Sequence, residues 1–158
     1  MKGPLFYSKI LLFGEYGIIK DSKGLSIPYN FYKGALKHSQ KHSTLSDESN
    51  NVLKDYYQYL KDIDTSLVRF KLDKMASDIS DGMYFDSSIP RGYGVGSSGA
   101  LVAAIYDRYA LDKVTVLENL TRDKLLKLKV IFAEMESFFH GKSSGLDPLN
   151  SYLSLPIL

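Results

Sequence analysis

The 158-residue sequence predicts one soluble domain that combines strands with helices. Its length is enough to bury one sizeable core and too short for two ordinary domains. A composition of 44% hydrophobic and 24% charged residues is typical of soluble globular proteins. Apolar residues alternate in some segments and recur with helical spacing in others, so both kinds of element are expected.

A β-hairpin is predicted at the start of the chain. Residues 5–13 are apolar with one lysine among them, and residues 17–20 continue in β-prone types. Residues 21–24, Asp-Ser-Lys-Gly, are a turn signal, after which residues 25–29 can return as a second strand.

The middle of the chain is predicted to contain a polar segment, one helix and two strands. Residues 37–51 are rich in His, Ser, Asn and Lys, which indicates a loop or an exposed element. Within them Ser46 is placed to cap a helix that runs to about residue 63. Residues 67–72 alternate apolar and polar side chains, which indicates a half-buried strand, and residues 81–86 are a further strand candidate.

Two helices and an apolar end are predicted in the second half. The first helix follows a glycine-rich loop and spans about residues 98–109. The second has apolar periodicity over residues 125–139, is preceded by Thr121 and stops at Gly141, a typical helix terminator. Residues 153–158 are apolar without a polar tail, so we expect the chain to be part of a longer protein.

Charge and cysteine content exclude several classes of function. The 20 basic and 18 acidic residues leave a net charge of +2, so neither a nucleic acid nor a membrane surface is an expected partner. No cysteine is present, which excludes disulfides and thiolate metal sites and suits the cytoplasm. Charges at positions 9, 15 and 20 interrupt the apolar start, so it is neither a signal peptide nor a membrane span. The sequence does not indicate an oligomeric state.

The most informative segment is the loop at residues 90–99, Pro-Arg-Gly-Tyr-Gly-Val-Gly-Ser-Ser-Gly, directly ahead of an apolar helix start. Glycines let backbone N–H groups approach an anion closely, and the helix dipole behind them favours negative charge. The hydroxyls of Ser97 and Ser98 add ligands for a phosphate or a magnesium ion. The loop therefore predicts a phosphate or nucleotide site.

Other interpretations of this loop stay open. A Walker A motif is excluded, because its Lys-Ser/Thr ending is missing. Residues 94–99 match Gly-x-Gly-x-x-Gly, the dinucleotide fingerprint, and Glu118 lies roughly 20 residues further on, where a ribose-binding acid is expected. That fingerprint belongs directly after a strand, however, and residues 90–93 intervene. The plainest alternative is a glycine turn in which Ser97 or Ser98 is an ordinary N-cap.

Charged residues in two other segments are unusual for their surroundings. Glu136 lies near the C-terminal end of a predicted helix, where its charge opposes the dipole and calls for a partner such as a cation. Asp147 follows a loop of small residues that can approach a ligand. Lys9 lies in an apolar strand, where it either meets an anion or extends to the surface. The plain alternatives are a solvated Glu136, an Asp-Pro turn, and a helix-end His140 that bonds a carbonyl.

Together, these three segments resemble the GHMP kinase superfamily, which includes galactokinase, homoserine kinase, mevalonate kinase and phosphomevalonate kinase. The segment around Lys9 looks like the family's lysine-containing strand followed by Gly-Glu-His, with Tyr16 in place of the His. The glycine loop is similar to Pro-x-x-x-Gly-Leu-Gly-Ser-Ser-Ala, with Val95 and Gly99 as departures. Residues 136–147 match Glu-x-x-x-His-Gly-x-x-Ser-Gly-x-Asp position for position, so the resemblance is nearest to mevalonate kinase.

The resemblance implies roles for individual residues. The phosphate loop corresponds to Gly92, Gly94, Gly96, Ser97, Ser98 and Gly99. Magnesium would be held by Ser98 and Glu136. The catalytic aspartate corresponds to Asp147, and the lysine associated with it to Lys9. Second-tier motif positions, near the substrate, correspond to Glu15, His140 and Ser144.

The resemblance also implies an α+β fold and an activity. Residues 1–158 would form the nucleotide-binding N-terminal lobe, with a left-handed β-α-β crossover, and the C-terminal acceptor lobe would be missing from the chain. The implied function is ATP-dependent phosphorylation of a small-molecule alcohol, above all mevalonate in isoprenoid biosynthesis, with ATP and Mg²⁺. The alternatives are a nucleotide-binding fragment or regulatory module without turnover, an ATP-using decarboxylase of the same superfamily, and a dinucleotide-binding oxidoreductase. The oxidoreductase leaves Lys9, Glu136 and Asp147 unexplained.

Overall fold

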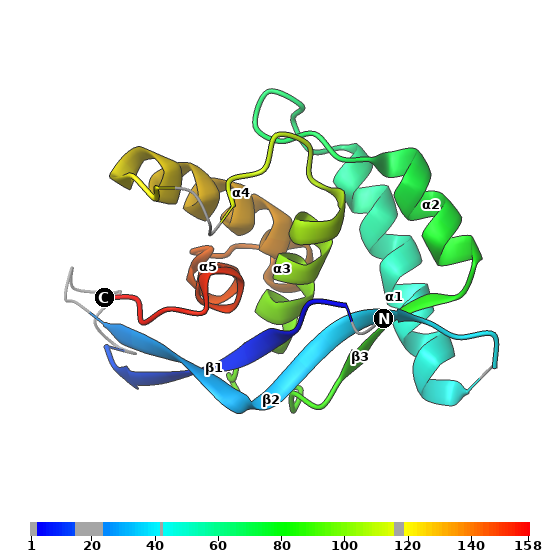
Figure 1. The fold of residues 1–158 in the computed structure, drawn as a ribbon, viewed down its shortest axis with the longest axis horizontal. Coiled ribbons are helices and arrows are strands. Elements are labelled where there is room, and N and C mark those ends of the chain that lie inside the picture. Colours follow the sequence, from blue (N-terminus) through cyan, green and yellow to red (C-terminus); the bar gives the residue numbers. More distant parts are fainter. Residues whose placement is uncertain (1–2, 15–23, 42, 116–118) are drawn as a thin grey trace.

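The computed structural model describes residues 3–14, 24–41, 43–115 and 119–158. These residues form an α+β domain in which helices lie over a three-stranded sheet (Figure 1), so the predicted fold class is confirmed. In chain order the elements are β1 (Phe6–Phe13), β2 (Leu25–His38), α1 (Thr44–Lys61), α2 (Leu72–Ser80), β3 (Met83–Ser87), α3 (Ser97–Tyr109), α4 (Arg122–His140) and α5 (Leu146–Leu153).

The predicted N-terminal hairpin is confirmed. β1 and β2 pair antiparallel, with Ser8 opposite Tyr29 in the register. The expected strand continuation at residues 17–20 and the turn at residues 21–23 lie outside the described residues. The hairpin forms one side of the sheet, and α3 and α5 cover it in Figure 1.

β2 is the central strand and is longer than the predicted residues 25–29. Its second half pairs antiparallel with β3, with Leu36 opposite Phe85, so the first residues of the polar segment 37–51 belong to a strand. β3 confirms the strand expected at residues 81–86. Both strand pairs among the described residues are antiparallel, whereas a β-α-β crossover joins parallel strands. The left-handed crossover implied by the resemblance is therefore not found there.

The first helix begins three residues before the predicted start. Its N-cap is Ser43, whose Oγ accepts a hydrogen bond from the N–H of Ser46 at 3.2 Å. The Oγ of Ser46 accepts one from the N–H of Ser43 at 3.1 Å, which completes a reciprocal capping box. Ser46 is thus the third helical residue and not the cap. α1 ends at Lys61, close to the predicted end, and buries Leu53 and Tyr56 in the core.

The strand predicted at residues 67–72 is wrong. These residues form a turn with one isolated bridge, between Phe70 and Ala110, and Leu72 begins α2. The alternation in six residues was misleading, because Leu72 belongs to a helical face that continues through the buried Met75 and Ile79. A spacing of three and four residues aligns these side chains on one side of a helix.

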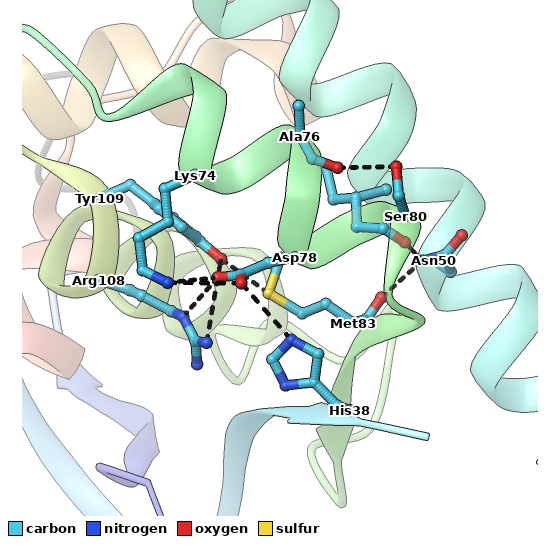
Figure 2. A network of polar contacts seen from close by, with 10 residues as sticks. His38, Asn50, Lys74, Ala76, Asp78, Ser80, Met83, Arg108 and Tyr109 are labelled. Atoms are coloured by element: carbon cyan, nitrogen blue, oxygen red, sulfur yellow. Dashed lines mark hydrogen bonds and ion pairs between the residues drawn. The ribbon is translucent and has the colours of Figure 1, made fainter. Parts of the chain in front are cut away.

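α2 is joined to α3 and to β2 by a network centred on Asp78 (Figure 2). The Asp78 carboxylate accepts hydrogen bonds from the Tyr109 hydroxyl at 2.6 Å and from Arg108 Nε at 3.2 Å. The Lys74 ammonium lies 3.4 Å away, and the His38 ring lies 3.8 Å away. Burial by itself would raise the pKa of Asp78, but the Tyr109 hydrogen bond and the charges of Arg108 and Lys74 outweigh it and hold that pKa below its ordinary value.

α3 is the centre of the core. It confirms the helix predicted at residues 98–109, and every residue from Gly99 to Tyr106 is buried. A helix that is apolar on all sides needs covering on all sides. The sheet, α4 and α5 provide this covering, and the Tyr106, Phe132 and Tyr152 rings meet edge to face.

The last two helices complete the layer above the sheet. α4 confirms the predicted helix, with Thr121 as its N-cap and Gly141, at a φ of 71°, as its C-cap. α5 was not predicted, and its short apolar run follows directly on the small-residue loop. Residues 153–158 return to β2, where Ser26 and Ile157 form a bridge.

Across the described part of the chain, none of the helices has the length and apolar character needed to span a membrane.

Candidate functional site

A cavity of about 630 Å³ lies between α1, β3, the glycine loop, the start of α3 and the end of α4. Its wall contains seven residues that the sequence singled out, namely Gly92, Gly94, Gly96, Ser97, Ser98, His140 and Asp147. Its volume falls in the range of small-molecule sites. The candidate residues of two distant segments, the glycine loop and residues 136–147, therefore converge on one cavity.

The glycine loop has the backbone shape that an anion site needs. Gly92, Gly94 and Gly96 all have positive φ, between 67° and 83°, a region that favours glycine. Gly96 is itself the N-cap of α3, and no side chain caps the helix. The interpretation of Ser97 or Ser98 as an N-cap is therefore wrong. Within the described ranges, no side chain accepts from the first amides of α3, and these amides lie at the cavity wall, where a phosphate can bind them.

Glu136 is buried beneath the start of α3, with only 3% of its surface exposed. The Ser98 hydroxyl donates to its Oε1 at 3.0 Å and also lies 2.9 Å from His140 Nε2. The Ser143 hydroxyl donates to the other carboxylate oxygen. Burial raises the pKa of Glu136, the Ser143 and Ser98 hydrogen bonds oppose that rise, and the nearby Asp147 charge adds to it.

Lys9 meets an anion and does not extend to the surface. Its Nζ lies 3.0 Å from Oδ1 of Asp147, and its side chain is only 11% exposed. The Lys9 backbone N–H donates to the carbonyl of Val95 at 3.0 Å, which fixes the strand to the glycine loop. Asp147 is 36% exposed and lines the cavity, so it can reach a ligand while Lys9 supports it from behind.

Lys9 and Glu136 lie behind wall residues, and three further predicted site residues lie away from the cavity wall or outside the described residues. Gly99 is buried on α3 against the first turn of α5. Ser144 lies in the loop before α5, where its Oγ accepts from the N–H of Leu146 at 3.4 Å. Glu15, and also Glu118 of the dinucleotide interpretation, lie outside the described residues.

Sequence analysis missed the other half of the cavity. One end is apolar, with walls from α1, β3, α3 and α4 formed by Val52, Phe85, Leu101, Phe138 and Phe139. Helical periodicity marks such side chains only as core, and the fold is needed to show which of them face a cavity. Arg91 is the only Lys or Arg in the wall formed by the described residues, among which it makes no ion pair or hydrogen bond. Its position in the glycine loop was the one feature of the sequence that could have indicated that Arg91 lines the cavity.

The donor set around Ser98 suits magnesium. Mg²⁺ prefers oxygen ligands and is usually held by one or two protein groups together with substrate phosphates and water. The Ser98 hydroxyl and the Glu136 carboxylate provide two such oxygens side by side. Over the described ranges, no group of three or more His, Cys, Asp or Glu side chains is arranged to hold a metal by itself. The residues therefore fit an ion that arrives with a phosphate ligand.

This arrangement of a glycine loop, a helix N-terminus and a buried carboxylate is typical of domains that bind phosphorylated ligands. The chain belongs to the GHMP kinase family, because the family model for the GHMP kinases N terminal domain matches residues 52–154, about two thirds of the sequence. The match contains the glycine loop, Glu136 and Asp147, whereas Lys9 precedes it. A comparison with curated proteins found no match. Family membership indicates a small-molecule kinase domain and favours it over the oxidoreductase interpretation.

Proposed function

We propose that this domain binds ATP together with Mg²⁺ and supports transfer of the terminal phosphoryl group to a small-molecule alcohol. The observation that carries the proposal is the convergence of three features on one cavity. These are the uncapped start of α3, the Ser98–Glu136 pair and the Lys9–Asp147 pair. A phosphoryl-transfer site needs groups that hold the phosphates, the metal ion and the acceptor hydroxyl, because its catalysis consists mainly of positioning and charge stabilisation.

The glycine loop and α3 would hold the phosphates. Positive φ at Gly94 and Gly96 lets the backbone turn its N–H groups to one side, and the helix dipole adds a partial positive charge. Arg91 lies in the cavity wall, and Lys9 lies against the wall residue Asp147, so each adds a positive charge near the phosphates. The apolar end, with Phe85 and Phe139, would receive the base of the nucleotide.

Ser98 and Glu136 would hold the magnesium ion. When bound, Mg²⁺ neutralises charge that develops between the β- and γ-phosphates. Glu136 would have to be ionised to act as a ligand, whereas burial favours its protonated form. We therefore expect nucleotide and metal binding to lower the pKa of Glu136.

Asp147 would take the proton of the acceptor hydroxyl. The hydroxyl oxygen forms a bond to the γ-phosphorus, the bond from that phosphorus to the bridging oxygen breaks, and ADP leaves. Asp147 is the more exposed member of its pair, and Lys9 Nζ holds one of its oxygens at 3.0 Å. The other oxygen makes no hydrogen bond to the described residues and is available to the acceptor.

Mevalonate is the acceptor that we propose, and cytoplasmic isoprenoid biosynthesis is the setting. The support is the match of residues 136–147 to the mevalonate kinase form of the motif. The absence of cysteine suits a reducing compartment.

Calorimetric titration with ATP, with and without Mg²⁺, tests the proposal. The wild-type chain should bind ATP more tightly with magnesium, and Ser98→Ala and Glu136→Gln should lose that response. Glu134→Ala is the matched control, because Glu134 is an exposed acid on the same helix, two positions away. A folded wild-type chain that binds no ATP, or variants that keep the full magnesium response, would contradict the proposal.

A further inference from the structure

Gly99 is an unexpected residue at its position. It is the third residue of α3, and glycine is among the poorest helix formers. The family motif that the loop resembles has alanine there, which is the best helix former. Gly99 lines no part of the cavity, so close approach of a ligand does not explain it.

The space at Gly99 is occupied by the backbone of Asp147. A Cβ atom on Gly99 would lie 2.8 Å from the Asp147 carbonyl carbon, 2.9 Å from its Cβ and 2.9 Å from the Pro148 nitrogen. Ordinary van der Waals contact begins at 3.4 Å. The first turn of α5 therefore rests directly on the bare backbone of α3.

The other side of Asp147 is equally constrained. Its carboxylate is 3.0 Å from Lys9 Nζ, and Lys9 is fixed through its backbone to the carbonyl of Val95. The Lys9 stem itself passes Gly96 so closely that a Cβ there would lie 3.0 Å from Lys9 Cγ. Two glycines of the loop thus provide the surfaces on which Lys9 and Asp147 rest.

We propose that Gly99 is a positioning residue for Asp147. Its missing side chain lets α5 approach α3 closely enough for the Asp147 carboxylate to reach both Lys9 and the cavity. The role rests on the proposed function, in which Asp147 receives the acceptor proton. A methyl group at Gly99 would displace the Asp147 backbone by about half an ångström, and displacements of that order lower the rates of positioned reactions.

The displacement would concentrate at the first turn of α5, because the rest of the helix is held. The Asn150 amide donates to the carbonyls of Ser26 at 3.2 Å and Leu155 at 3.0 Å, and Leu149 and Tyr152 are buried. α3 is buried over most of its length and cannot retreat. Asp147 therefore has to move relative to Lys9.

The test compares Gly99→Ala with Gly3→Ala, a control whose new Cβ would meet only the Leu36 carbonyl oxygen at 3.8 Å. Crystal structures should show a longer Lys9 Nζ to Asp147 Oδ1 distance in Gly99→Ala and no change in the control. At saturating ATP, the rate of phosphoryl transfer should fall by about tenfold or more in Gly99→Ala. An unchanged ion-pair distance, or an unchanged rate beside a displaced Asp147, would overturn the proposal.

The structural readout separates this proposal from the proposed function. If the wild-type protein shows no phosphoryl transfer, that result counts against the proposed kinase function. A longer Lys9–Asp147 distance in Gly99→Ala would still support the placement of Asp147 by Gly99. If Gly99→Ala does not fold, the same change is made beside Asp147→Gly, which removes the Asp147 Cβ and gives the backbone at position 147 the conformational freedom to move the other two close atoms away. The double variant should then recover a cooperative urea transition, and failure to recover it would overturn the proposal.

Discussion

The ammonium of Lys9 and the carboxylate of Asp147 meet at 3.0 Å, although one residue lies in the first strand and the other in the last helix. Asp147 lines the cavity, and the pair links β1, the glycine loop and α5. Lys9 is almost covered and Asp147 is partly exposed, so the aspartate is the member that a ligand can contact. This relationship leads to the first prediction.

Asp147→Asn should nearly abolish phosphoryl transfer and leave ATP binding almost intact. The amide keeps the size of the side chain but cannot accept the acceptor proton, and general-base contributions of this kind are worth about a thousandfold in rate. The measurement is ADP release with mevalonate, beside calorimetric titration with ATP. Asp55→Asn is the control, because Asp55 is another carboxylate in the cavity wall that the proposed reaction does not use. Loss of both ATP binding and transfer, or of neither, would exclude this role for Asp147.

Part of this architecture could be predicted from local sequence alone. The hairpin could be predicted because β-prone residues flank a turn signal in a short stretch of sequence. α4 could be predicted from its helical spacing, with Thr121 marking its start and Gly141 its end. The helix α2 was missed, because the short alternation at residues 67–72 concealed the start of a helical face. α5 was missed because its eight residues are too few to show a clear period.

The contacts of the site could be predicted only in part. Burial cost indicated that Lys9 either meets an anion or extends to the surface, and the helix dipole indicated that Glu136 calls for a partner. Neither argument identified the groups that pair with them. The pairing of Lys9 with Asp147 was anticipated through a family resemblance, and the fold was needed to show the contact. The apolar wall at Phe138 and Phe139 depends on how α1, β3 and α4 pack, which no local pattern contains.

Replacing the buried carboxylate in Glu136→Gln should make the unliganded protein more stable near neutral pH. The pKa of Glu136 is higher in the folded state than in the unfolded state. Glu136 therefore contributes its full stability below its unfolded-state pKa, and this contribution is lost as the pH rises through its folded-state pKa. Glutamine carries no charge and avoids that loss. Urea unfolding should therefore show a gain at about pH 8 that disappears at about pH 4, below the unfolded value.

The same variant should respond less to ligand. ATP with Mg²⁺ should raise the unfolding midpoint of the wild-type chain, because a ligand that binds only the folded state stabilises it. Glu136→Gln lacks the proposed metal ligand and should show a smaller rise. A variant that is less stable than wild type at about pH 8 would contradict the stated cost of burying Glu136.

Asp78→Asn should lower stability at neutral pH by about 2 kcal/mol, the scale of a hydrogen bond to a charged group. The pKa of Asp78 is held below its ordinary value, so its contribution is present above the unfolded pKa and is lost as pH falls through the folded pKa. The difference between variant and wild type should therefore shrink in acid. Urea unfolding across that pH range is the measurement, with Asp81→Asn, a change of the exposed C-cap residue of the same helix, as the control. A difference that grew as the pH fell would contradict the assignment.

Arg91→Gln should weaken ATP binding by about tenfold, which corresponds to about 1.4 kcal/mol. Arg91 lines the cavity beside the glycine loop and makes no hydrogen bond or ion pair with the other described residues, so its guanidinium is available to a phosphate. If it contacts the terminal phosphates, AMP affinity should stay unchanged and Arg91→Lys should keep part of the ATP affinity. Calorimetric titration with ATP and AMP makes the comparison, with Lys142→Gln as a control that removes a nearby exposed charge outside the cavity wall. Equal losses in Arg91→Gln and Lys142→Gln would show a general effect of charge and would remove Arg91 from the phosphate site.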